Sequence, residues 1–201
     1  PLARRVVIEA LRDNLVWRAG RVAITIRKVA IVCLYDILRH RFLDQSILFE
    51  VTPGLLPILK TDLEDYDASA RQLVALCLGH IFTLLPRALG EKPVQELYPA
   101  LLKRLDDSSD SVRLAVCGTL RAFLKAAPRE AFLGTVLDYT VDQLLIHLDD
   151  QDAALQAQVL DVCRAAAEID ASKVALKATA ARNTHRSPIL VDDLIAFCRA
   201  L

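Results

Sequence analysis

Three stretches of this 201-residue chain end in nearly the same letters. They read L-K-T-D-L-E-D at Leu59–Asp65, L-K-R-L-D-D at Leu102–Asp107 and L-I-H-L-D-D at Leu145–Asp150. Their final aspartates are spaced 42 and then 43 residues apart. This regular spacing predicts that one structural unit recurs along the chain.

An arginine follows at a fixed distance in the first two copies, because Arg71 and Arg113 each come six residues after the last acid. The third copy has Gln156 at this place, and a further arginine, Arg27, lies 44 residues before Arg71. A period of about 43 residues is typical of the helix-pair solenoids of the HEAT and armadillo type, in which each repeat buries its apolar face by stacking on its neighbours. We therefore predict an all-α fold, a HEAT-type α-solenoid of about four stacked helical hairpins plus a terminal capping helix.

The repetition gives no reason to divide the chain, so we expect residues 1–201 to form a single solenoid segment. The chain contains no methionine and opens without a stretch resembling a signal peptide, which favours a fragment of a longer protein. The expected units are a partial repeat at residues 1–18, repeats at 19–62, 66–106, 109–149 and 152–182, and a capping helix at 188–201.

Prolines indicate where several helices begin or end. Pro53 predicts a break in the helix expected over residues 43–61, because proline lacks a backbone N–H and disfavours a helical conformation in the residue before it. Pro93 suits the first turn of a helix. Ser187 followed by Pro188 predicts the start of the last helix.

Composition favours a helical protein of the cytoplasm. Apolar residues make up 54% of the chain and aromatic residues 5%, so we expect a core built from Leu, Val, Ile and Ala, as stacked helices favour. The longest apolar run in the first long helix, Val29–Tyr35, is far shorter than the ~20 residues of a membrane-spanning helix.

The five cysteines are widely spaced and form no C-x-x-C motif, so we expect reduced thiols in the core and a reducing compartment. They are Cys33, Cys77, Cys117, Cys163 and Cys198.

Motifs that would indicate catalysis or ligand binding are not found. The glycines form neither a phosphate-binding loop nor a dinucleotide-binding fingerprint, and the four histidines are isolated. Paired acids such as Asp106 and Asp107 lack the alternate-oxygen pattern of a calcium loop, which favours a structural role over a metal site. The sequence predicts no enzyme, no cofactor and no metal site.

Charge is zero overall but uneven along the chain. Residues 1–41 carry nine Lys and Arg against three acids. This basic end could meet an acidic partner or a nucleic acid, or could be a solvated face. Binding of RNA or another polyanion through this end is the alternative function, although few aromatic residues accompany the basic ones to stack on bases.

The spacing between acid and arginine predicts a structural ladder. An acid in the turn before a helix lies near that helix's amino end, whose exposed N–H groups and dipole favour negative charge. An arginine one turn further in can fork onto that carboxylate or onto the carboxylate of the adjacent repeat. The expected ladder residues are Asp65, Arg71, Asp107, Arg113 and Asp150.

Longer phrases resemble a known family. One is N-L-V-W-R-A-G-R at Asn14–Arg21, followed by I-R-K-V-A at Ile26–Ala30. The other is L-Y-P-A-L-L-K-R-L-D-D-S-S-D-S-V-R at Leu97–Arg113, with L-L-I-H-L-D-D at Leu144–Asp150. Together they resemble the C-terminal repeats of the dynein axonemal assembly factor 5 family, whose members contain HEAT repeats, over roughly residues 14–165.

The resemblance implies a non-catalytic scaffold or co-chaperone in the cytoplasmic pre-assembly of axonemal dynein arms for motile cilia. The implied partners are dynein heavy or intermediate chains, other dynein assembly factors and chaperones. No membrane is implied. The family offers no catalytic residue to transfer.

We expect a partner to bind a concave surface lined by the second helix of each pair, together with the basic end. Trp17 is either an anchor between repeats or an interface residue, since Trp and Arg are favoured in interfaces. The candidate partner-binding residues are Arg4, Arg5, Trp17, Arg18, Arg21, Lys60, Lys103, Arg104 and His147.

Overall fold

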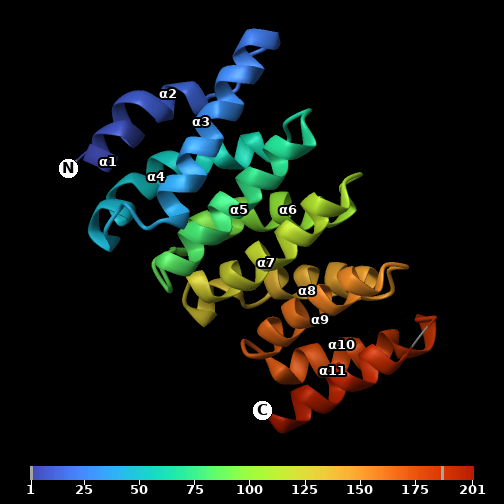
Figure 1. The fold of residues 1–201 in the computed structure, drawn as a ribbon. Coiled ribbons are helices and arrows are strands. Elements are labelled where there is room, and N and C mark those ends of the chain that lie inside the picture. The colour runs from blue at the N-terminus through green and yellow to red at the C-terminus, as the bar shows by residue number, and fades with distance from the viewer. Residues whose placement is uncertain (1, 187) are drawn as a thin grey trace.

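The chain folds as an α-solenoid in which helices stack one beyond another along one direction (Figure 1). The structure, a computed structural model, describes residues 2–186 and 188–201 and contains no strand among them. Its helices are α1 (Leu2–Arg5), η1 (Val6–Leu11), α2 (Arg12–Leu15), α3 (Arg21–Arg39), α4 (Gln45–Asp62), α5 (Ala68–Leu84), α6 (Glu91–Lys103), η2 (Arg104–Asp106), α7 (Asp110–Ala126), η3 (Arg129–Phe132), α8 (Thr135–Leu148), α9 (Ala153–Ala167), α10 (Ala171–Ala181), η4 (Arg182–Thr184) and α11 (Ile189–Ala200).

The helices alternate between two layers. In one layer α3, α5, α7, α9 and α11 contact each other in succession, and in the other α2, α4, α6, α8 and α10 do the same. A continuous cluster of buried Leu, Val, Ile, Ala and Phe side chains fills the space between the layers. The predicted HEAT-type stack of helical hairpins with a capping helix is confirmed.

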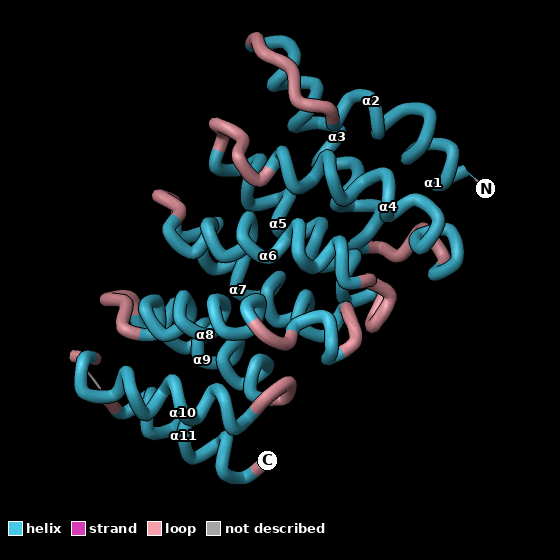
Figure 2. Tube along the Cα trace, turned by 180° about the vertical axis from the view of Figure 1, so that it is seen from behind, coloured by secondary structure: helices cyan, strands magenta, loops and turns pink. Residues whose placement is uncertain are grey.

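The segments that join the helices gather along two opposite edges of the stack (Figure 2). Segments 16–20, 63–67, 107–109 and 149–152 form one edge, which we call the ladder edge. Segments 40–44, 85–90, 127–134 and 168–170 form the other, which we call the return edge. Successive helices run in opposite directions, so every second joining segment falls on the same edge. Segments of the ladder edge therefore stack on each other, and so do segments of the return edge.

The break predicted near Pro53 is wrong, because α4 runs unbroken from Gln45 to Asp62. A proline inside a helix leaves the carbonyl four residues earlier without its usual donor. Here that residue is Phe49, which is 59% exposed, so the missing hydrogen bond lies on the solvent-facing side of α4. Burial of the apolar face that includes Leu48 and Leu59 outweighs the lost hydrogen bond.

The other proline signals agree better with the structure. Pro93 lies in the first turn of α6, as predicted. Pro188 takes the N-cap position of α11, while Ser187 lies outside the described residues. Aspartates cap several other helices: the side chains of Asp44, Asp67, Asp152 and Asp170 each accept a hydrogen bond from a main-chain N–H of the helix that follows.

Four cysteines are buried as expected, but the prediction is wrong for Cys33, which is exposed. Cys77, its equivalent on α5, faces α3 with its Sγ 3.9 Å from the Ile31 carbonyl. Cys33 occupies the same position on α3, where the described residues place no preceding helix of that layer. Burial raises the pKa of Cys117 to about 12, as expected for an unreactive core thiol.

Candidate functional site

The ladder edge carries a repeated contact between arginine and aspartate, which is most complete at Arg71 and Asp107. Arg71 on α5 donates from Nε to Asp107 Oδ2 and from Nη2 to Asp107 Oδ1, both at 2.7 Å. Its Nη1 donates to the main-chain carbonyl of Asp65 at 2.7 Å. One guanidinium therefore joins the loop before its own helix to the carboxylate of the next loop.

The same contact recurs one unit earlier and one unit later. Arg27 donates from Nε to Asp65 Oδ2 at 2.7 Å, and Arg113 donates from Nη2 to Asp150. Each also donates to a main-chain carbonyl before its own helix, at 3.2 and 3.0 Å. Gln156 keeps the main-chain half of the contact, because its Nε2 donates to the Asp150 carbonyl at 2.8 Å. Of the two geometries that the spacing allowed, the structure has the contact to the adjacent repeat.

Each ladder carboxylate also shapes its own loop. Asp65, Asp107 and Asp150 accept a hydrogen bond from the main-chain N–H two residues later, at 2.9, 3.0 and 2.8 Å. Burial by itself would raise the pKa of Asp107 and Asp150, but hydrogen bonds from arginine and from these N–H groups outweigh it and hold both pKa values below their usual range. Both side chains are therefore ionised at neutral pH.

Asp62, at the end of α4, is a buried carboxylate that sequence reasoning missed. It is 0% exposed, and among the described residues neither of its oxygens has a hydrogen-bond donor. Its Oδ1 lies 3.8 Å from Nε of Arg27, whose own hydrogen bonds go to Asp65 and a main-chain carbonyl. Burial raises the pKa of Asp62 to about 7 despite the nearby guanidinium, so the group titrates near neutral pH.

Two of the predicted partner-binding residues are engaged in ion pairs at the basic end. Arg4 donates from Nε to Glu50 Oε2 at 3.1 Å, which links α1 to α4. Arg5 donates from Nε to Glu9 at 3.3 Å, one turn along the same helical segment. Both pairs are exposed, so they remain open to competition from a partner.

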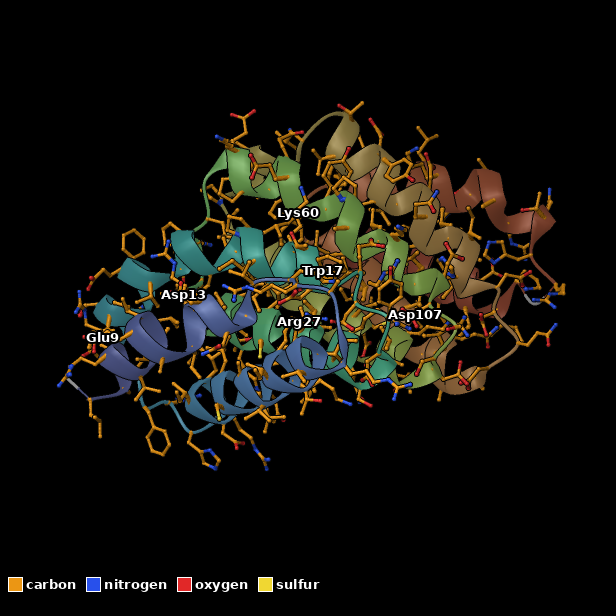
Figure 3. The ribbon with its side chains drawn as sticks, turned by 90° about the horizontal axis from the view of Figure 1, so that it is seen from above. Glu9, Asp13, Trp17, Arg27, Lys60 and Asp107 are labelled. Carbon is orange, nitrogen blue, oxygen red and sulfur yellow. The ribbon has the colours of Figure 1, made fainter. Side chains whose placement is uncertain are left out.

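Three other candidates lie together in or beside segment 16–20 at the start of the ladder edge. Trp17 is 41% exposed. Figure 3 labels it together with Arg27 of the first rung. Arg18 and Arg21 are exposed as well, and neither side chain has an ion-pair partner among the described residues. Since the main-chain carbonyl of Arg18 accepts from Arg27, the first rung of the ladder holds this segment in place.

The remaining candidates lie near the ends of α4, α6 and α8. Lys60 is partly exposed. Lys103 and Arg104 share Glu64, with contacts of 2.7 and 3.4 Å. His147 differs from these because its side chain is buried, and burial lowers its pKa, so it offers little charge or surface to a partner.

Sequence reasoning did not include Arg27 among the ladder residues, although its spacing of 44 residues from Arg71 was a signal for it. The ladder acid of the preceding unit is replaced by Arg21, which hid the pattern.

No group of three His, Cys, Asp or Glu side chains in residues 2–186 and 188–201 could hold a metal ion. Over the same ranges, no helix has the length and apolarity needed to cross a membrane.

The repeated hairpins are matched by a family model described as "Sister chromatid cohesion protein PDS5 protein" over residues 46–187. The matched range runs from α4 to the segment before α11 and contains the acids of all three rungs. The chain belongs to this family. Membership is consistent with the stacked helical hairpins that the structure shows.

The chain is also similar to proteins called dynein axonemal assembly factor 5. The protein from Xenopus laevis is 36% identical over 187 residues, and that from Homo sapiens is 31% identical over 200 residues. The alignments cover 92% and 98% of this chain but 22% and 23% of the relatives, so the chain spans about a fifth of their length. The family resemblance predicted from the phrases at residues 14–21 and 97–113 is confirmed.

Solved structures with a similar fold are helical repeat proteins. A designed armadillo repeat protein has a TM-score of 0.66 and 15% identity, and the match covers 98% of this chain and 84% of that one. The HEAT-like repeats protein from Thermococcus onnurineus NA1 has a TM-score of 0.53 and 15% identity, covering 98% and 91%. At these identities the likeness shows the fold alone.

Proposed function

We propose that this chain is a non-catalytic, protein-binding scaffold segment that takes part in axonemal dynein assembly. The observation that carries the proposal is its similarity, along nearly its whole length, to two proteins called dynein axonemal assembly factor 5. We place this role in the cytoplasm, as a scaffold or co-chaperone for motile cilia. The proposed partners are dynein heavy or intermediate chains, other assembly factors and chaperones.

The ladder supports a scaffold role because it fixes consecutive hairpins relative to each other. Arg71 holds Asp107 with two parallel hydrogen bonds, Arg27 holds a single oxygen of Asp65, and Arg113 holds Asp150 through Nη2 alone. A surface that is already ordered loses little conformational entropy when a partner binds. Repeat proteins use such extended, pre-formed surfaces to bind other proteins.

Trp17, Arg18 and Arg21 are the best supported contacts of this function. They are exposed, they have no ion-pair partner among the described residues, and their types are those enriched among residues that dominate binding energy. The structure does not specifically favour the alternative, polyanion binding, since Arg4 and Arg5 already pair with acids.

The proposal is tested by affinity capture from the cytosol of ciliating cells with the tagged chain as bait, followed by mass spectrometry. We expect axonemal dynein chains or other dynein assembly factors to be enriched at moderate salt. The variant Arg18→Glu/Arg21→Glu should weaken their binding by about thirtyfold, if each arginine contributes on the order of 1 kcal/mol.

The matched control is Arg199→Glu, which reverses an exposed charge at the far end, on α11. It should capture the same proteins as the unmodified chain. Failure to enrich any dynein chain or assembly factor would refute the proposed role. Equal loss in the control would instead refute Arg18 and Arg21 as the contacts.

A further inference from the structure

The return edge carries one arginine in each of its first three loops, namely Arg41, Arg87 and Arg129. They are spaced 46 and 42 residues apart, close to the repeat period. All three are exposed, and none makes an ion pair or a side-chain hydrogen bond with any residue that the structure describes. The arginines of the ladder, on the opposite edge, are all paired. The return edge therefore carries a second periodic set of arginines, and these make no hydrogen bond or ion pair that would stabilise the described fold.

Two of these arginines have a main-chain conformation that favours glycine. Arg41 has φ 55° and Arg87 has φ 59°, and they are the only described residues other than glycine with positive φ. At the end of α3, the N–H of Phe42 donates to the carbonyl of Ile37 at 3.0 Å, which is the Schellman pattern with Arg41 in the place usually taken by glycine. An L side chain in this region costs about 1 kcal/mol.

At Arg87, main-chain groups alone make the contacts that shape the loop. The N–H of Arg87 donates to the carbonyl of Lys125 at 3.2 Å, and the N–H of Leu89 donates to the carbonyl of Ala126 at 2.9 Å, at the end of α7. Glycine at position 87 would make the same contact without strain. Among the described residues, the side chain of Arg87 therefore adds no hydrogen bond or ion pair to this loop.

Arg87 and Arg129 line a cleft of about 550 Å³ from consecutive loops. Lys125 also lines it, but this ammonium is paired with Glu168 at 3.3 Å. In the loop before it, Arg41 is followed by Phe42, which is 64% exposed. Arginine and aromatic side chains, here Arg41 and Phe42, are among the residue types enriched in protein–protein interfaces.

We propose that the return edge binds an acidic segment of a partner protein, whose carboxylates take hydrogen bonds from Arg41, Arg87 and Arg129. The planar guanidinium suits a carboxylate because it donates two parallel N–H groups. A protein segment is favoured over a nucleic acid because Glu130, which makes no ion pair with any described residue, lines the same cleft. Its carboxylate would repel a continuous chain of phosphates, whereas spaced carboxylates can avoid it. This surface is separate from the Trp17–Arg21 contacts of the proposed function.

The test measures binding of a fluorescent peptide of alternating Glu and Gly to the purified chain by anisotropy at moderate salt. The variant Arg41→Gly/Arg87→Gly removes two proposed contacts and the main-chain strain at once. We expect its Kd for the peptide to rise about tenfold, at ~0.7 kcal/mol for each exposed ion pair. Its thermal unfolding midpoint should stay equal or rise, because glycine relieves the left-handed conformation.

The matched control is Arg12→Gln/Arg199→Gln, which removes the same charge from two exposed arginines outside the loops of the return edge and should leave peptide affinity unchanged. Equal weakening in both variants would show attraction by net charge and would overturn the proposal. So would unchanged affinity in the glycine variant, or a lower unfolding midpoint. Tighter binding of a single-stranded RNA or of phosphatidylserine vesicles than of the peptide would show that the ligand class is wrong. None of these outcomes depends on dynein capture, so the two proposals fail independently.

Discussion

Asp62 and Arg27 show how the neighbours of a residue set its charge. Arg27 is 1% exposed, and its guanidinium is compensated by hydrogen bonds to Asp65 and to a main-chain carbonyl. Asp62 Oδ1 lies 3.8 Å from Nε of Arg27, and the Asp62 side chain is fully buried with no hydrogen-bond donor among the described residues. Its ionised form is therefore disfavoured, because burial without hydrogen bonds penalises charge.

This environment predicts an unusual pH dependence of stability. The folded pKa of about 7 lies above the ordinary value of 3.8, so between these pH values the folded chain binds the additional proton. Stability from this group is present at low pH, falls as pH rises from about 4 to about 7, and is constant above that. We expect Asp62→Asn to remove a fall on the order of a few kcal/mol, measured by urea unfolding at several pH values.

The exposed Asp193→Asn serves as the control for Asp62→Asn and should keep the pH profile of the unmodified chain. The lowered pKa values of Asp107 and Asp150 act in the opposite sense and at more acid pH, where their ionised form is lost. An Asp62→Asn profile parallel to that of the unmodified chain would show that Asp62 does not titrate in this range.

At the scale of the element, the close approach of α5 and α7 depends on a small residue. Thr119 on α7 donates from its hydroxyl to the carbonyl of Ala75 on α5 at 2.7 Å. A Cβ atom added at Gly79 would lie 3.1 Å from the same hydroxyl, which is buried and held by its hydrogen bonds. A Cβ added at Gly118, on the same helix as Thr119, would meet no atom within 4 Å.

The two glycines therefore form a matched pair for an element-scale prediction. Gly118→Ala should stabilise the chain by about 0.5–1 kcal/mol, because alanine has the higher helix propensity. Gly79→Ala should lose that gain and destabilise by about 1 kcal/mol, because the added methyl group pushes α5 from α7. Denaturant unfolding of both variants measures the difference, and equal stabilisation would contradict the close packing at Gly79.

The element scale also shows why helix boundaries were only partly predictable. Local signals located the first-turn position of Pro93, since proline geometry depends on a few neighbouring residues. The effect of Pro53 was not predictable in this way. Helix α4 survives it because the apolar face that includes Leu48 and Leu59 packs against helices elsewhere in the stack.

At the scale of the whole molecule, each hairpin contacts mainly its neighbours, so stability should behave as a sum of local terms. Arg71→Ala leaves the buried Asp107 with only the Arg104 guanidinium at 3.2 Å and the N–H of Ser109, and should cost about 3 kcal/mol, the lower end of the range for breaking a buried ion pair. We expect hydrogen exchange to accelerate in α5 and α7 more than in α10 and α11, because the broken rung joins only the former.

Arg5→Ala is the matched control for Arg71→Ala, since it removes an exposed pair within one helical segment. It should change stability by no more than about 0.5 kcal/mol. Uniform acceleration of exchange along the whole chain after Arg71→Ala would show that the solenoid unfolds as one cooperative unit. That outcome would contradict a ladder of local rungs.

Spacing along the chain was enough to predict the repeat, the helical class and the kinds of residue on the ladder edge. These follow from short local patterns and from a period of about 43 residues, which no single packing contact alters. The packing of the stack decided which carboxylate each arginine holds, because Arg71 and Asp107 meet only when consecutive hairpins stack with one particular offset. The same packing left Arg41 and Arg87 unpaired on the opposite edge, buried Asp62 and kept α4 whole. Contacts between residues some forty positions apart produce these features, and no local pattern contains that information.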